Sequence, residues 1–267
     1  MTAEGLVKVF PGVRALDGAN LRLEAGTVHA LLGENGAGKS TLIKIVTGVY
    51  RPDAGRILIA GAERHFSGPL DAQHAGIGVV HQERNLIPAF SVAENIALQV
   101  VRSRFGFVDR AAMRDTARDC LAQLDVDLRL DRPVSELSVA QLQLVEIAKA
   151  LAVESRVLLL DEPTASLTPE ESEHLFAVVR RLRDQGRVVV LVSHKLEEVF
   201  AVADTVTVLR DGRSVAEGAP LAGYTRGEIV DLMVGRAHAD ISLTARTVDR
   251  AATPALELVD VATASGH

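Results

Sequence analysis

The stretch GENGAGKST, residues 33–41, restricts the fold of this chain more than any other. It places Gly33, Gly36 and Gly38 close together and ends in a lysine and two hydroxyl residues. Glycine lets a backbone approach another group closely because it has no Cβ. The run VHALL before it predicts a buried strand, and STLIKIVTGVY after it predicts a helix. A strand, a glycine-rich loop and a helix in this order are typical of a phosphate-binding loop.

The pattern G-x-x-x-x-G-K-[ST] assigns a task to each part of this loop. Backbone N–H groups surround the phosphates, the Lys39 ammonium neutralises the β- and γ-phosphates, and the Ser40 hydroxyl ligates Mg²⁺. Chance would produce the pattern in about one in a hundred chains of this length, and the flanking strand and helix make a chance match rarer. The predicted nucleotide-binding residues of the loop are Gly33, Glu34, Asn35, Gly36, Ala37, Gly38, Lys39, Ser40 and Thr41.

Short apolar runs predict the fold class. They are TVHALL, RILIAG, GIGVV, RVLLLD, RVVVLV and TVTVLR. Continuous apolar runs of this length are typical of strands that are buried on both faces, as in a mostly parallel sheet covered by helices. The sequence therefore predicts an α/β protein.

Helix starts are marked by capping boxes, in which a hydroxyl residue precedes a glutamate by three positions. The stretch 91–154 contains helical patterns and no convincing strand, which predicts a helical insertion in the α/β chain. Pro169 occupies the favoured first position of a helix. The capping pairs are Ser91 with Glu94, Thr168 with Glu171, and Thr225 with Glu228.

Composition limits the remaining classes. The 267 residues are 48% hydrophobic and 24% charged, the balance of a globular protein. The net charge of −6 gives no electrostatic reason to expect a nucleic-acid partner. A single cysteine, Cys120, excludes an internal disulfide. The N-terminus MTAEGLVKVF lacks the pattern of a signal peptide and no apolar run is long enough to span a membrane, so we expect the chain to stay where it is made.

Two carboxylates follow the apolar run in RVLLLDEP. Asp161, at the end of a buried strand, can hold Mg²⁺ beside the phosphates. Strand alternation points Glu162 to the other face, where it can orient or deprotonate an attacking water. An isolated Asp-Glu pair is more often a solvated strand end, but the phosphate loop favours the functional interpretation.

Several further motifs follow the phosphate loop in a fixed order: VVHQERNLIPAFSVAEN, LSVAQ, LLLDEPTASLT and VLVSHKLEEV. With them the chain, over residues 1–236, resembles the nucleotide-binding subunit of an ATP-binding-cassette (ABC) transporter. The resemblance implies a P-loop NTPase with a mostly parallel core sheet, an antiparallel β subdomain and an inserted α-helical subdomain at about 91–154. It implies ATP and Mg²⁺ as ligands.

The resemblance also implies the catalytic residues. Asp161 matches the magnesium-site aspartate, and Glu162 matches the glutamate that polarises the water. Gln82 matches the glutamine that reaches Mg²⁺ or the water. His194 matches the histidine that contacts the γ-phosphate, although alone it reads as a cap between a strand and a helix. Lys39 completes the set.

Two further positions take their meaning from the family. Phe10, in KVFPGVRALDG, matches an aromatic that stacks on adenine. Stacking of this kind contributes about 1 kcal/mol, and the ordinary alternative is a core phenylalanine. Thr168 stands where the family often has an aspartate that links two ATP sites, so a threonine there can cap a helix but carries no charge.

The motif LSVAQ matches the family signature LSGGQ, which binds the γ-phosphate held by an opposite cassette. Its residues are Leu137, Ser138, Val139, Ala140 and Gln141. Val139 and Ala140 replace the two glycines, whereas Ser138 and Gln141 keep the spacing of a capping box. We interpret the motif as a working variant, because the helix dipole and backbone donors persist.

Within the family, KVFPGVRALDGANL and DLMVGR resemble the tandem ATPase subunits of bacterial monosaccharide importers. On this resemblance, residues 237–254 are a linker and 255–267 begin a second, truncated cassette. The implied partners are a second cassette, in the same full-length chain or as a homodimer, an integral membrane permease and, indirectly, an extracytoplasmic sugar-binding protein. The implied location is the cytoplasmic face of the membrane.

Three alternatives stay open at this point. The chain can belong to an importer of another small solute, such as a nucleoside, an amino acid or a lipid. It can be a non-transport ABC ATPase, although the negative net charge and the absence of sustained heptads oppose this. It can be a module that binds ATP without hydrolysing it, which the presence of both Glu162 and His194 opposes.

Overall fold

A six-stranded sheet forms the centre of the fold, with the strand order β12-β11-β3-β10-β9-β6. Its inner strands are parallel, and only the edge strand β12 runs antiparallel to its neighbour. The strands are β3 (Thr27–Leu32), β6 (Ile77–Val80), β9 (Val157–Asp161), β10 (Val188–Val192), β11 (Thr205–Arg210) and β12 (Arg213–Pro220). This sheet confirms the predicted α/β class with a mostly parallel core.

The computed structural model describes residues 1–80, 85–101, 103–104 and 107–235. Gln82, the predicted linker at 237–254 and the predicted start of a second cassette at 255–267 lie outside the described residues. Met1–Gly235 form one compact unit.

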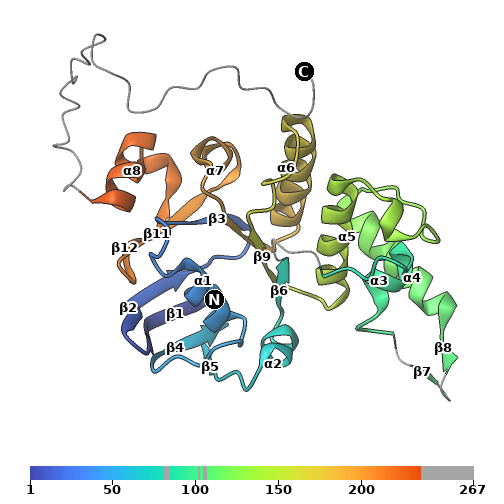
Figure 1. Ribbon diagram of the computed structural model, residues 1–267, viewed down its shortest axis with the longest axis horizontal. Helices are drawn as coiled ribbons and strands as arrows, with labels where there is room; N and C mark the ends of the chain where they lie inside the picture. Colours follow the sequence, from blue (N-terminus) through green and yellow to red (C-terminus); the bar gives the residue numbers. More distant parts are fainter. Residues whose placement is uncertain (81–84, 102, 105–106, 236–267) are drawn as a thin grey trace, which may run out of the picture. The chain divides into compact units, whose positions relative to one another are not determined.

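Both faces of the central sheet are buried, which explains the continuous apolar runs. In β9, Leu158 and Leu160 join a core with residues of α6, whereas Val157 and Leu159 join a core with residues of α1. Because alternate side chains of β9 enter different apolar cores, Val157 through Leu160 are all apolar. Figure 1 shows α6 and α7 on one side of the sheet and α1 on the other.

A second sheet of four antiparallel strands has the order β2-β1-β4-β5 and packs over α1 through a shared core. Its strands are β1 (Thr2–Phe10), β2 (Val13–Arg22), β4 (Ala54–Ile59) and β5 (Ala62–Arg64). The assignment of RILIAG to the parallel sheet is wrong, because this run forms most of β4 in the antiparallel sheet. In β4 only Ile57 is buried.

Two of the helices around the central sheet begin where the capping pairs predict. The Thr168–Glu171 and Thr225–Glu228 boxes are both formed, and Pro169 is the first residue of its helix. The helices around the sheet are α1 (Lys39–Val46), α2 (Pro69–His74), α6 (Pro169–Asp184), α7 (Leu196–Val202) and α8 (Arg226–Val234), with a 3₁₀ turn, η2, at Leu221–Gly223, and the predicted pairs start α6 and α8. Within the described residues, no helix is both long and apolar enough to cross a membrane.

Between β6 and β9 the chain forms a group of helices that pack on one another. They are α3 (Val92–Ala97), α4 (Arg110–Leu124), the 3₁₀ turn η1 (Val134–Glu136) and α5 (Val139–Ala152). The Ser91–Glu94 capping box starts α3 as predicted. The expectation of no strand here is wrong in one detail, because β7 (Ser103–Arg104) and β8 (Phe107–Val108) form a two-residue ladder.

Candidate nucleotide site

Three loops meet at one edge of the central sheet because β3, β9 and β10 run parallel and in register. Val192, the last residue of β10, pairs with Asp161 on β9 and with Leu31 on β3. The phosphate loop, the acidic strand end and the segment with His194 therefore leave the sheet side by side. Ligand sites of open parallel sheets lie outside the carboxyl ends of their strands.

The glycines of the phosphate loop serve two different purposes. Gly33 has φ +149°, and a Cβ there would collide with the Leu209 carbonyl oxygen of β11. Gly38 has φ +106°, and a Cβ there would lie 2.7 Å from the Ala15 carbonyl oxygen of β2. Gly36, at φ +86°, has no neighbouring atom within 4 Å of such a Cβ. Packing of the loop against the protein thus requires two of the glycines, whereas Gly36 faces open space where a ligand can approach.

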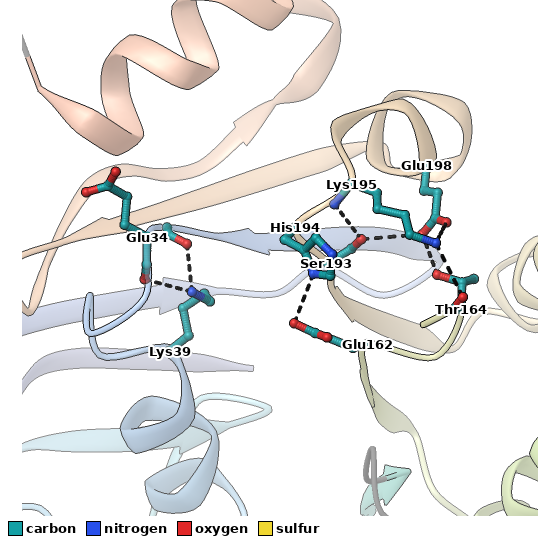
Figure 2. A network of polar contacts seen from close by, with 9 residues as sticks. Glu34, Lys39, Glu162, Thr164, Ser193, His194, Lys195 and Glu198 are labelled. Carbon is teal, nitrogen blue, oxygen red and sulfur yellow. Dashed lines mark hydrogen bonds and ion pairs between the residues drawn. The ribbon is translucent and has the colours of Figure 1, made fainter. Parts of the chain in front are cut away.

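Lys39 begins α1, and its ammonium group folds back over the loop. Its Nζ donates to the Gly33 carbonyl at 2.6 Å and to the Glu34 carbonyl at 2.9 Å (Figure 2). Partial burial lowers the pKa of Lys39. The negative charges of Glu162, Asp161 and Glu34 oppose this shift. The ammonium and the strand-end carboxylates therefore form one electrostatic site.

Asp161 ends β9, and Glu162 leaves the strand in a left-handed turn. Glu162 has φ +46°, and its N–H donates to the Val192 carbonyl at 2.9 Å. The prediction that strand alternation orients Glu162 is therefore wrong, because the strand stops one residue earlier. A left-handed non-glycine residue is strained and persists where its surroundings fix it, often at functional sites.

The imidazole of His194 lies against the carboxylate of Glu162. Its Nδ1 is 3.1 Å from Glu162 Oε1 (Figure 2). The His194 side chain is 66% exposed and that of Glu162 is 30% exposed, so a ligand can reach both. The interpretation of His194 as a helix cap is wrong, because the N-cap of α7 is Lys195.

Glu198, a residue that the sequence does not single out, bonds to neighbours of this pair in the sequence. Glu198, in the first turn of α7, accepts from the Thr164 hydroxyl at 2.5 Å and from the Ser193 hydroxyl at 3.4 Å (Figure 2). It also pairs with Lys195 Nζ at 3.0 Å. The i,i+3 spacing of Lys195 and Glu198 is the one local signal in the sequence, and it reveals nothing of Thr164.

The signature-like residues lie in a different part of the molecule. Ser138 is the N-cap of α5, and its capping box with Gln141 is formed. Leu137, just before it, is 9% exposed, and Val139 and Ala140 begin the helix. Figure 1 shows α5 among the helices α3 and α4, apart from α1. The chain therefore does not bring this motif to its own phosphate loop.

Phe10 ends β1 beside the aromatic ring of Tyr50. The two ring centroids are 5.4 Å apart in an edge-to-face arrangement, and Lys8 Nζ lies 5.7 Å from the Phe10 centroid. Phe10 is only partly buried, which differs from a core phenylalanine. Among the other predicted residues, Ser40 and Thr41 lie in the first turn of α1, and Ala37 donates its N–H to the Glu34 carbonyl at 3.1 Å within the loop that also contains Asn35.

The residues present fit a nucleoside triphosphate with a magnesium ion. The helix N-terminus at Gly38 has no side-chain cap, so its amides face the glycine loop unblocked by a side chain. Ser40 and Asp161 offer the oxygen ligands that Mg²⁺ prefers. The Lys39 ammonium supplies the positive charge that phosphates require.

Fold and site together define a nucleotide-binding P-loop protein of the α/β class. The sequence profile described as ABC transporter matches residues 16–165. The chain belongs to the ABC transporter family.

Known proteins of similar sequence and structure agree with this family. The "Ribose import ATP-binding protein RbsA 2" of Burkholderia ambifaria is 49% identical over 96% of this chain and 50% of its own length. The solved structure of a nucleotide-free ATP-binding cassette from an ABC transporter has a TM-score of 0.76 at 27% identity, over 88% of this chain and 98% of that chain. A dimeric post-hydrolysis cassette bound to ADP and Pi has a TM-score of 0.68 at 26% identity, over 81% and 97%. The chain spans about half the length of the curated relatives it matches.

Proposed function

We propose that this chain is an ATP-binding and ATP-hydrolysing cassette of an importer. The observation that carries the proposal is the meeting of the glycine loop, the Lys39 ammonium and the Glu162–His194 pair at one sheet edge. Membership of the ABC transporter family supports it, as does the similarity to a cassette solved with ADP and Pi.

In this proposal the loop amides and Lys39 hold the β- and γ-phosphates. The Glu162 carboxylate orients a water molecule for attack on the γ-phosphorus, and it accepts the water proton as the bond to the bridging oxygen breaks. His194, at 3.1 Å from Glu162, holds this carboxylate toward the γ-phosphate. Positioning and electrostatic stabilisation supply most of the rate enhancement of such reactions.

The ligands are ATP and Mg²⁺. Ser40, Asp161 and Gln82 would hold the metal ion, which when bound neutralises charge on the phosphates. Phe10 would stack on the adenine ring. Because stacking accepts any flat base, it supports affinity more than base selectivity.

A second cassette completes the ATP site. In this chain the signature-like segment at the start of α5 lies apart from the phosphate loop, so it serves the nucleotide of another cassette. The dimeric state of a similar cassette supports this arrangement. The second cassette is either part of a longer chain or a second copy. Thr168, as the cap of α6, carries no charge to link the two sites.

The transported solute is proposed to be a monosaccharide such as ribose. The support is the relative from Burkholderia ambifaria, which is described as a ribose import ATP-binding protein. The cassette would act at the cytoplasmic face of the membrane, bound to a membrane permease that receives sugar from an extracytoplasmic binding protein. The residues of the site bind nucleotide and none contacts the solute, so the sugar assignment depends on the relatives alone.

Nucleotide binding and hydrolysis test the proposal directly. Mg-ATP hydrolysis by the chain should rise faster than linearly with protein concentration, because two cassettes must meet. Glu162→Gln should retain ATP binding by calorimetric titration and lose turnover. Lys39→Ala should lose tight binding, since it removes the only side-chain cation of the loop. Unchanged ATP affinity in Lys39→Ala, or wild-type turnover in Glu162→Gln, would refute the assigned roles.

A further inference from the structure

We infer that Glu198 is a positioning residue for the Glu162–His194 pair. The inference rests on the proposed function and deepens it by naming what holds the reacting carboxylate in place. Glu198 contacts neither of the two residues directly. It acts through the loops that carry them, which Figure 2 shows converging on its carboxylate.

The Glu198 carboxylate joins two segments that are distant in the sequence. Its Oε2 accepts from the Thr164 hydroxyl at 2.5 Å, and Thr164 follows Glu162 by two residues. The same oxygen accepts from the Ser193 hydroxyl at 3.4 Å, and Ser193 directly precedes His194. One carboxylate group is therefore bonded to both loops that present the reacting pair.

Lys195 closes this network. Its Nζ lies 3.0 Å from Glu198 Oε1 and 3.4 Å from the Thr164 carbonyl. Its backbone N–H donates to the Ser193 hydroxyl at 3.0 Å. The Glu198 side chain is only 13% exposed, so water competes weakly for these bonds. Thr164 and Ser193 are also buried, at 2% and 6% exposure.

The pair itself has few local means of holding its geometry. The His194 side chain is 66% exposed, and Glu162 adopts a left-handed conformation that its surroundings must maintain. Strand pairing fixes both loops only as far as Asp161 and Val192. Beyond these residues, the bonds to Glu198 link the two loops through the buried hydroxyls of Thr164 and Ser193, whereas the His194–Glu162 contact is exposed.

Charge makes Glu198 specific for this task. Its two oxygens receive two hydroxyl donors and one ammonium, a set that suits a carboxylate and not an amide. Glu197, the preceding residue, is 76% exposed and pairs with Arg226 at 3.4 Å on the outside of the fold. It therefore offers a matched control on the same helical turn.

The experiment measures ATP hydrolysis and ATP affinity on the same variants. Glu198→Gln should lower kcat by about a hundredfold, because displacement of a reacting group by about 1 Å has an effect of this size. ATP affinity should stay within about threefold, since the bonds of Glu198 go to Thr164, Ser193 and Lys195, outside the phosphate loop. Glu198→Asp should retain part of the rate. Glu197→Ala should behave as the wild type in both measurements.

Thr164 supplies a second pair of variants that separates positioning from general stability. Thr164→Ser keeps the hydroxyl donor and should keep kcat, whereas Thr164→Val removes the donor at nearly constant volume and should lower it. The double variant Thr164→Val/Glu198→Gln should have about the same kcat as the less active of the two single variants, because both substitutions break one network. Additive losses, or a kcat of Glu198→Gln equal to the wild type, would overturn the inference.

A failed proposed function gives a different result from a failed inference. If the wild type binds ATP and never hydrolyses it, the proposed hydrolysis fails. Hydrogen exchange then tests whether Glu198 links the two loops. Peptides covering 161–168 and 193–199 should exchange faster in Glu198→Gln than in Glu197→Ala. Equal exchange in the two variants would refute the link between the loops.

Discussion

The starts of α1 and α5 offer two solutions to the same problem, the free N–H groups of a helix N-terminus. Gly38 precedes α1 in a left-handed conformation and provides no side-chain cap. Ser138 precedes α5, and its hydroxyl accepts the Gln141 N–H at 3.3 Å. The Gln141 side chain in turn accepts the Ser138 N–H at 3.1 Å. One helix keeps its donors for a ligand, and the other uses two of them internally.

This difference separates a site from a stable helix start. The uncapped start of α1 depends on packing against β2 and β11 for its shape, and an anion would satisfy its donors. The capped start of α5 is stable without a ligand, and the amides of Val139 and Ala140 are outside the capping box. A variant signature can thus keep donors for the nucleotide of another cassette while it loses both family glycines.

The largest change in the free energy of unfolding is expected for substitutions in the phosphate loop. Gly38→Ala should lower the free energy of unfolding by about 3 kcal/mol, because the Cβ meets Ala15 and Leu16 and the backbone is left-handed. Gly36→Ala should lower it by about 1 kcal/mol, since its Cβ meets open space and only the φ of +86° opposes it. Urea denaturation measures both. Equal losses would show that packing does not set the shape of the loop.

The strand that leads into the phosphate loop should be sensitive to acid. His29 of β3 is fully buried between the hydroxyls of Thr205 and Thr207, and burial lowers its pKa from 6.5 to about 4. Between these pH values the unfolded state binds a proton that the folded state does not. The contribution of His29 should therefore lower the free energy of unfolding by roughly 3 kcal/mol as the pH falls from about 6.5 to about 4, and this contribution should not grow at lower pH.

Denaturation of the wild type and of His29→Gln at pH 7 and pH 4 isolates this contribution, because the other titrating groups are common to both. An NMR titration of the His29 ring checks it without a variant. A ring that protonates near pH 6.5 in the folded protein would contradict the prediction.

The smallest effect is expected at α5. Ser138→Ala should cost about 1 kcal/mol through loss of the cap, and Ser138→Gly only a few tenths, as at other N-caps. Ser135→Ala, an exposed serine just before the cap, serves as the control and should change stability by less than about 0.5 kcal/mol. If Ser138→Ala equals the control, the capping box does not stabilise α5, and the contrast with α1 disappears.

Local patterns predicted much of this molecule correctly. The strand–loop–helix unit at residues 27–46 and the capping boxes at Ser91, Ser138 and Thr168 appear as expected. Each depends on residues close together in the sequence, so composition and spacing suffice. The prediction that RILIAG belongs to the parallel sheet was wrong, because an apolar run indicates a buried strand and does not indicate which sheet contains it.

At the site, the residue types were predicted and their geometry was not. The sequence named Lys39, Glu162 and His194, but Glu162 was expected on a strand and lies in a left-handed turn. The spacing of Glu198 from Lys195 indicated only a local ion pair, because its partner Thr164 is 34 positions away in the sequence. Contacts of this kind exist only once two parallel strands are aligned.

The sequence by itself determined the phosphate loop, the helix caps and the α/β class, since these follow from backbone freedom, local hydrogen bonds and the period of apolar residues. The tertiary structure alone decided which loops meet. The register of β3, β9 and β10 places Lys39, Glu162 and His194 at one edge, whereas the start of α5 lies with α3 and α4 in the group of helices between β6 and β9. Strand register is a property of the packed core, because it depends on which buried faces fit together rather than on any single segment.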